Sequence, residues 1–104
     1  MVVLNHKYEI YIPDSYIYNG KIEYYSDDKV DEVVKYIISN YNISGVSIRQ
    51  ESGYYNSSVG LTKMKNSIVY FYTSNNNIDL SYIKQFLPEQ ETVLVVKDNI
   101  GMLI

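Results

Sequence analysis

The sequence predicts a single α+β domain in which two helices cover one face of an antiparallel sheet. Three observations indicate this class. One segment repeats apolar residues at helical spacing, several runs are rich in β-branched and aromatic residues, and the turn signals between them fall at intervals that suit short elements. The chain has 104 residues, of which 46% are hydrophobic and 20% charged. This size and composition are enough for one core without disulfide or metal support.

The first strand is predicted over Lys7–Ile12, where aromatic and β-branched residues alternate with polar ones. Pro13 ends it, because proline cannot donate a ladder hydrogen bond. In the segment 14–26, the pair Asn19-Gly20 is a strong tight-turn signal between two short runs of tyrosine and isoleucine. The sequence leaves two alternatives open for this segment, a short hairpin or an ordered loop.

The clearest predicted element is a helix that follows this segment. Its apolar residues recur at i, i+3, i+4, i+7, i+8 and i+11, which places them on one stripe. They are Val30, Val33, Val34, Ile37, Ile38 and Tyr41. Residues 26–28, Ser-Asp-Asp, are expected to supply the N-cap and favourable negative charge. Asn40 and Asn42 are the expected terminators. The β-branched content means that burial of the stripe must hold the helix.

Two further strands are predicted in the middle of the chain. Ile43–Glu51 has the strand pattern, and Ser52–Ser58 is expected to be a long turn. Val59–Met64 would continue this turn as a ribbon and reverse at Lys65-Asn66. Ser67–Thr73 is apolar on both faces, so we expect it to lie centrally in the sheet.

The last third of the chain predicts a short helix over Asp79–Leu87, ended by Pro88, and a closing strand over Thr92–Val96. The apolar tail, Ile100–Ile104, is expected to dock on the domain or on a second copy. The resulting order, β-α-β-β-α-β, predicts a ferredoxin-like sandwich. Residues 14–26 and 52–66 are extra material that could add short strands.

Composition limits the chemistry that the chain could perform. It contains 13 tyrosines, one histidine and no cysteine, tryptophan or alanine. Thiol catalysis, disulfides and the common zinc sites are therefore excluded, and His6 is the only imidazole base. We predict no catalytic residue, cofactor or metal; the acidic residues at 27, 28, 31 and 32 are interpreted as a solvated helix start. A small enzyme without a recognisable catalytic motif remains an alternative.

Tyrosine is the residue type that points to a binding function, because its ring buries area and its hydroxyl remains able to hydrogen-bond. Tyr11, Tyr70 and Tyr72 are predicted to share the sheet face that the helices leave open. Tyr54 and Tyr55 are predicted to lie in a loop, either as a binding loop or as incidental residues of a hairpin tip. The first three positions resemble the stacking aromatics of the RNA-recognition motif, which would imply single-stranded nucleic-acid or nucleotide binding. The net charge of −3 opposes that alternative.

The chain is similar overall to small ferredoxin-like proteins of unknown function from phages, plasmids and archaeal viruses. The residues that carry this resemblance are Lys7–Ile12, Gly53-Tyr54-Tyr55, Ser67–Thr73 and Gln90–Lys97. The resemblance implies an accessory protein of a virus or mobile element that binds a host protein in the cytoplasm. We expect it to act as a homodimer, without a membrane. Absent alanine and abundant Tyr, Asn, Ile and Lys also indicate an AT-rich genome.

Overall fold

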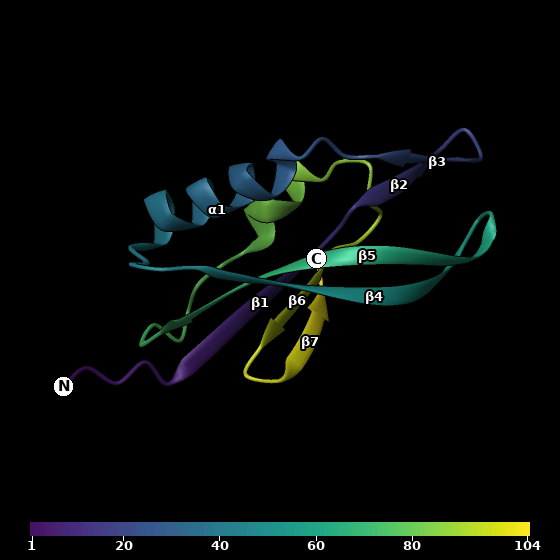
Figure 1. The fold of residues 1–104 in the computed structure, drawn as a ribbon. Helices are drawn as coiled ribbons and strands as arrows, with labels where there is room; N and C mark the ends of the chain where they lie inside the picture. Colours follow the sequence, from purple (N-terminus) through teal and green to yellow (C-terminus); the bar gives the residue numbers. More distant parts are fainter.

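A computed structural model, which describes all of residues 1–104, shows a five-stranded antiparallel sheet with two helices on one face and a separate two-stranded hairpin (Figure 1). The elements in chain order are β1 (His6–Pro13), β2 (Ser15–Tyr18), β3 (Lys21–Tyr24), α1 (Asp28–Tyr41), β4 (Ser47–Ser57), β5 (Gly60–Thr73), the 3₁₀ helix η1 (Ser81–Phe86), β6 (Leu94–Lys97) and β7 (Ile100–Leu103). The predicted α+β class is therefore confirmed.

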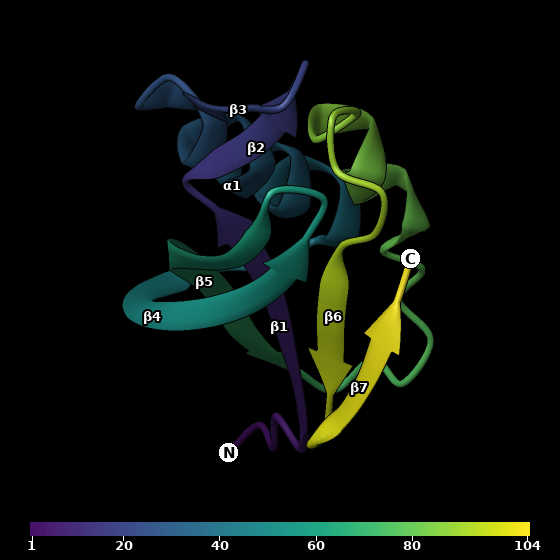
Figure 2. The ribbon, with the colours of Figure 1, turned by 90° about the vertical axis from the view of Figure 1, so that its right-hand side faces the viewer.

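The five strands lie in the order β4-β5-β1-β6-β7, with β1 in the centre (Figure 2). β1 pairs along its whole length with β5, placing Tyr8 opposite Phe71 and Ile10 opposite Val69. Because side chains alternate across a strand, these pairs share the helix side of the sheet, and Glu9 and Tyr70 share the other.

The hydrophobic core lies between the sheet and the helices. α1 contributes Val33 and Ile37, which are fully buried, so the apolar stripe faces the sheet as predicted. The helix ends at Asn42, whose left-handed backbone (φ 53°) suits asparagine. At its start, Asp27 is the N-cap residue and Asp28 puts negative charge in the first turn, as predicted, although Asp27 makes no side-chain capping bond. The buried core residues from the other elements are Tyr8, Ile10, Ile12, Ile43, Val69, Phe71, Leu80, Ile83, Leu87, Val93 and Val95.

The segment 14–26 forms the hairpin, one of the two alternatives that the sequence left open. β2 and β3 pair in register around Asn19 and Gly20. Both turn residues have positive φ, 51° and 75°, which is the conformation that a two-residue type I′ turn requires.

The prediction for residues 52–66 is wrong, because this segment holds no long turn and no reversal at Lys65-Asn66. β4 and β5 form one long hairpin that pairs continuously from Ser47 with Tyr70 to Ser57 with Gly60. The chain reverses at residues 58–59, and Gly60 follows with φ 99°. Gly53 lies within β4, where a Cβ atom would be 3.0 Å from the Tyr55 hydroxyl oxygen. This glycine permits a close approach and does not mark a turn.

The ferredoxin-like βαββαβ arrangement is not confirmed. The expected second helix is only a six-residue 3₁₀ helix, and the hairpin β2–β3 and strand β7 are additional. The closing strand begins at Leu94 and not at Thr92. The tail docks on its own domain: β7 pairs with β6, and Ile104 exchanges two backbone hydrogen bonds with Val93.

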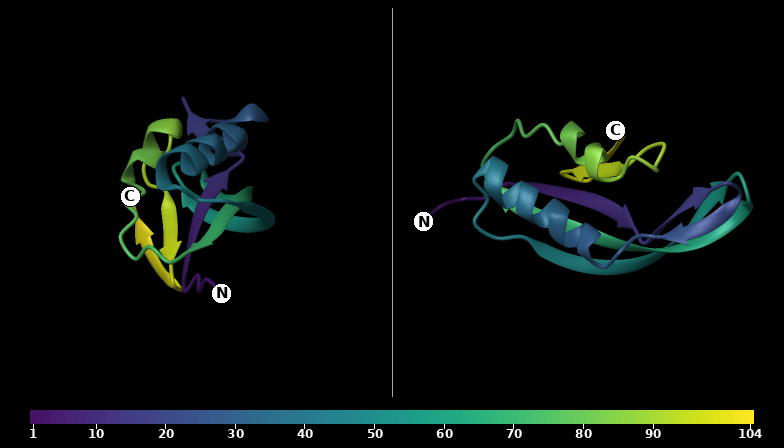
Figure 3. Two further views of the ribbon diagram at one scale, coloured as in Figure 1. Left: turned by 90° about the vertical axis from the view of Figure 1, so that its left-hand side faces the viewer. Right: turned by 90° about the horizontal axis from the view of Figure 1, so that it is seen from above.

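The molecule is elongated, with extents of 50 × 25 × 21 Å. Seen from above, the β2–β3 hairpin and the end of the β4–β5 hairpin project together from the helix-covered body (Figure 3). The elongation therefore comes from two hairpins at one end, which we call the two-hairpin end. The helices, β1, β6, β7, the first part of β4 and the last part of β5 form the body.

Candidate functional site

The five tyrosines singled out in the sequence lie in three places. Strand register puts Tyr11, Tyr70 and Tyr72 on the helix-free face of the sheet, as predicted. Tyr55 shares that face of β4, whereas its neighbour Tyr54 points to the opposite side and is 66% exposed. Tyr54 and Tyr55 therefore belong to a strand and not to a loop, and only one of them can contact a ligand on the helix-free face.

Tyr70 and Tyr72 belong to a cluster of charges on the body. A carboxylate oxygen of Glu9 lies 2.7 Å from the Arg49 guanidinium, with which it forms an ion pair, and 3.6 Å from the Lys7 ammonium nitrogen. The Arg49 guanidinium and the Lys7 ammonium lie 5.4 and 5.0 Å from the centre of the Tyr70 ring. The hydrogen bond to Glu9 raises the pKa of Arg49 above its usual range. Arg49 also pairs with Glu51 at 3.1 Å, so two cations and two carboxylates balance in the cluster, and Tyr70 already has two cations of this chain against it.

Tyr11 and Tyr55 line a cleft at the two-hairpin end. The cleft has a volume of about 610 Å³ and is bounded by β1, β2, the end of the β4–β5 hairpin, the segment before β6 with the first residue of β6, and Leu103 of β7. Figure 2 looks at this end of the molecule and shows the ribbons of β1, β2, the β4–β5 hairpin and β6. A third tyrosine, Tyr16 of β2, also lines it. Three rings from three separate elements therefore converge on one cavity.

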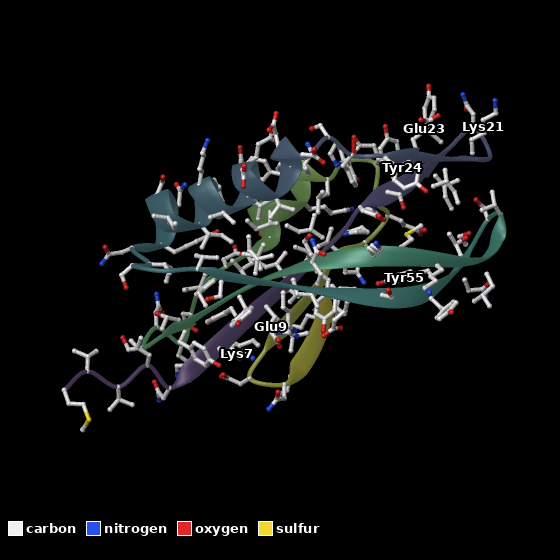
Figure 4. The ribbon with its side chains drawn as sticks, in the orientation of Figure 1. Lys7, Glu9, Lys21, Glu23, Tyr24 and Tyr55 are labelled. Atoms are coloured by element: carbon white, nitrogen blue, oxygen red, sulfur yellow. The ribbon has the colours of Figure 1, made fainter.

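One side of the cleft is lined by Tyr55 and Asn66, and Gly53 lies against the Tyr55 ring. The Asn66 amide nitrogen donates a 2.5 Å hydrogen bond to the Tyr55 hydroxyl, although Asn66 itself is only 3% exposed. The Tyr55 ring edge approaches Gly53 so closely that a Cβ atom there would lie 3.1 Å from it. Figure 4 shows Tyr55 on β4, well away from Lys7 and Glu9 on β1. Glycine and asparagine thus fix the position of this tyrosine.

The opposite side of the cleft is the segment 89–94, which is tied to the first hairpin. The Gln90 amide donates to the Ser15 carbonyl at 2.9 Å and to the Tyr25 hydroxyl at 3.3 Å. Tyr25 in turn donates to the Glu89 carboxylate at 3.2 Å and packs against Tyr16. Burial, reinforced by the nearby Glu89 charge, raises the pKa of Tyr25 above its usual range, so it remains a hydrogen-bond donor.

The charged groups that line the cleft are all acidic. Glu89 and Glu91 line it, and no lysine, arginine or histidine does. His6 lies outside the lining, on β1 beside the β6–β7 turn, paired with Asp98 at 2.7 Å. The structure contains no group of three or more His, Cys, Asp or Glu residues arranged to hold a metal ion. The arrangement offers stacking surfaces, hydrogen-bond acceptors and negative charge.

Sequence reasoning missed several residues of the cleft. Tyr16 falls in the segment 14–26, for which two alternatives stayed open, Asn66 falls in an expected turn, and Glu89 and Glu91 fall between the expected second helix and the closing strand. A signal existed for Tyr16, since the Asn19-Gly20 turn implies a hairpin that carries it. None existed for Asn66, whose position depends on the register of two strands that meet far from their turn.

Comparisons with protein family models, with curated proteins and with solved structures gave no match for this chain. Neither helix has the length and apolar character required to cross a bilayer. The case for a function therefore depends on the geometry of the cleft.

Proposed function

We propose that the protein binds another protein, without catalysis, by holding an exposed segment of that partner in the cleft between its two hairpins. The observation that carries this proposal is the convergence of Tyr11, Tyr16 and Tyr55 on one cavity of about 610 Å³. Cavities of roughly 300–1,000 Å³ are typical of sites that enclose a small group or side chain. Tyrosine supplies large contact area at low entropic cost and is enriched at protein interfaces.

Exposed apolar side chains next to the cleft would extend the contact surface. Tyr18 and Tyr24 lie on the first hairpin, and Val59 and Leu61 lie at the tip of the second. Figure 4 shows Tyr24 on β3, the hairpin that projects alongside Tyr55 on β4. A chain segment that enters the cleft could therefore contact both hairpins at once.

The alternative of nucleic-acid or nucleotide binding is less well supported. A phosphate entering the cleft would meet Glu89 and Glu91 and no basic side chain. On the body, Lys7 and Arg49 of the same chain lie against the Tyr70 ring, and they would compete with a base for it. The enzyme alternative would need turnover that depends on the cleft residues and survives His6→Ala.

A peptide-display selection against the immobilised protein tests the proposed function. We expect wild type to enrich peptides that bind it in solution, and Tyr55→Ala to lose that binding. Tyr54→Ala is the matched control, because it removes the adjacent ring from the opposite side of the same strand. Failure to enrich any peptide, or binding that Tyr54→Ala and Tyr55→Ala reduce equally, would count against the proposal.

Self-association is a second candidate, favoured by the outer edge of β4. This edge strand runs for 11 residues, Ser47–Ser57, contains neither proline nor lysine, and pairs only with β5. Such an edge can pair with a second copy. Light scattering after size exclusion tests the homodimer, and a monomer at high micromolar concentration would exclude it.

We further infer that the domain is an elaborated ferredoxin-like sandwich from a virus or mobile element, acting on a host protein in the cytoplasm. The order β4-β5-β1-β6 supports the first part, with α1 and η1 on one face and β2–β3 and β7 added. The second part is based on the sequence resemblance. Phage or virus genes beside the coding sequence would support it, whereas a metabolic operon would oppose it.

A further inference from the structure

We propose that the cleft takes the positively charged side chain of an arginine on the partner protein. This inference depends on the proposed function and specifies the chemistry of the group that enters. Three independent features of the cleft support it: its charge, a free acceptor on one wall, and the tyrosine rings that surround the cavity.

The charge of the cleft favours a cation. Glu89 and Glu91 line it without any basic residue. The ion pairs of the chain all form elsewhere, and neither of these carboxylates takes part in one. Glu89 accepts one hydrogen bond from Tyr25, and Glu91 is exposed with no side-chain hydrogen bond. Two negative charges thus face the cavity without a cation of this chain to balance them.

Asn66 supplies the second feature. Its amide nitrogen is bonded to Tyr55, but its amide oxygen, Oδ1, accepts no hydrogen bond within the chain. No side-chain oxygen of the molecule is sealed from solvent without a partner, so Oδ1 has access to solvent, and Asn66 lines the cleft. Asn66 is only 3% exposed. An acceptor held in place in this way can bind an N–H donor. A quaternary ammonium group has no N–H and could not donate to it.

The rings supply the third feature. Cations are attracted to the faces of tyrosine rings, and the molecule uses this contact elsewhere, with Arg49 on Tyr70 at 5.4 Å and Lys63 on Tyr54 at 5.8 Å. Arginine fits the cleft better than lysine. Its planar guanidinium stacks on aromatic faces and presents five donors, which suit an amide oxygen and carboxylates as acceptors.

The test compares a pentapeptide that carries one central arginine, blocked at both ends, with the same peptide in which uncharged citrulline replaces the arginine. Binding is followed by the shifts of ¹⁵N–¹H resonances of the labelled protein. We expect the arginine peptide to move the Asn66 side-chain amide and the backbone amides of Gly53 and Tyr55. Its affinity should exceed that of the citrulline peptide by about tenfold, the effect of one charge-assisted hydrogen bond. A lysine peptide should bind with intermediate affinity.

Glu91→Gln is expected to reduce the affinity for the arginine peptide severalfold while leaving the spectrum of the fold unchanged. Glu32→Gln is the control, since it removes the same charge from α1, away from the cleft. Equal affinity for the arginine and citrulline peptides, with both lost in Tyr55→Ala, would overturn the charge assignment and leave the proposed function intact. Absence of binding by every peptide, together with an empty display selection, would overturn both.

Discussion

The body and the two-hairpin end are held together by different interactions. The body encloses a core of 13 buried residues between the sheet and its helices. The projecting part of the β4–β5 hairpin is held by side-chain hydrogen bonds, such as those between Asn66 and Tyr55 and between Ser57 and Thr62. This difference implies that stability comes mainly from the body. The two-hairpin end can then expose tyrosines, carboxylates and a free amide oxygen, because the fold does not depend on them.

Removing a large side chain from each region is the strongest test of this division. Phe71 is 2% exposed and stacks on Tyr8 at 5.5 Å, so Phe71→Ala should lower the free energy of unfolding by about 3–5 kcal/mol. Leu61, at the β4–β5 tip, is 76% exposed, and Leu61→Ala should change it by less than about 0.5 kcal/mol. Urea unfolding followed by circular dichroism measures both. If both variants lost a comparable free energy of unfolding, stability would not come mainly from the body.

The buried carboxylate of the body is expected to give the next largest effect. Glu9 is buried and paired with both Arg49 and Lys7, so Glu9→Gln should cost about 1–3 kcal/mol. Glu51→Gln removes the other, exposed partner of the same Arg49 and should cost no more than about 0.5 kcal/mol. The same unfolding measurement compares them. If Glu51→Gln were the costlier change, burial of Glu9 would not decide how much the Arg49 ion pairs contribute to stability.

A methyl group added at one glycine should affect the cleft more than the fold. In Gly53→Ala, the new Cβ would lie 3.0–3.2 Å from the Tyr55 ring and the Asn66 amide, so Tyr55 must move. We expect a loss of about 1 kcal/mol, at the low end for overpacking, because a partly exposed ring can swing aside. Gly45→Ala is the matched control, since its Cβ would meet nothing within 4 Å. If Gly53→Ala still bound the peptide as wild type does, the position of Tyr55 would not contribute to binding.

The body was more predictable from the sequence than the two-hairpin end, and the reason is physical. The stripe from Val30 to Tyr41 and the alternation in β1 are local patterns that burial then enforces. Gly53 resembled a turn residue, yet it lies within a strand because the Tyr55 ring packs against it. The actual turn, at residues 58–59, carries no Asn-Gly pair. At the tip no core selects the register, so local signals were ambiguous there.

The candidate site was predicted only in part for a related reason. Residue type predicted tyrosine as the binding residue, which stays a prediction, and strand register divided the five candidates between the cleft, the charged cluster and the opposite face. Neither Glu89 nor Asn66 carries a local signal. They reach the cleft because the segment before β6 and the middle of β5 meet there in three dimensions, which no local pattern encodes.

The smallest expected effect concerns a polar contact within the body, between the β6–β7 turn and β1. Asp98 accepts hydrogen bonds from the His6 ring and from the Lys7 backbone N–H, at 2.7 and 2.8 Å. The His6 contact, followed by the Lys7 bond, lowers the pKa of Asp98. A lowered pKa stabilises the fold at pH values above the ordinary aspartate pKa of about 3.9. That stabilisation is lost as the pH falls through the folded value.

Asp98→Asn keeps the oxygen that accepts the hydrogen bond from the Lys7 backbone N–H and removes the negative charge. It therefore isolates the contribution of that charge to stability. Thermal unfolding should show wild type slightly more stable than Asp98→Asn near neutral pH, with the difference disappearing below about pH 4. Because the contact is exposed, the shift should be smaller than for any substitution above. A difference that persisted in acid would assign the effect to turn geometry, since Asp98 and Asn99 both have positive φ. The backbone conformation of the β6–β7 turn would then stabilise the body in addition to its hydrophobic core.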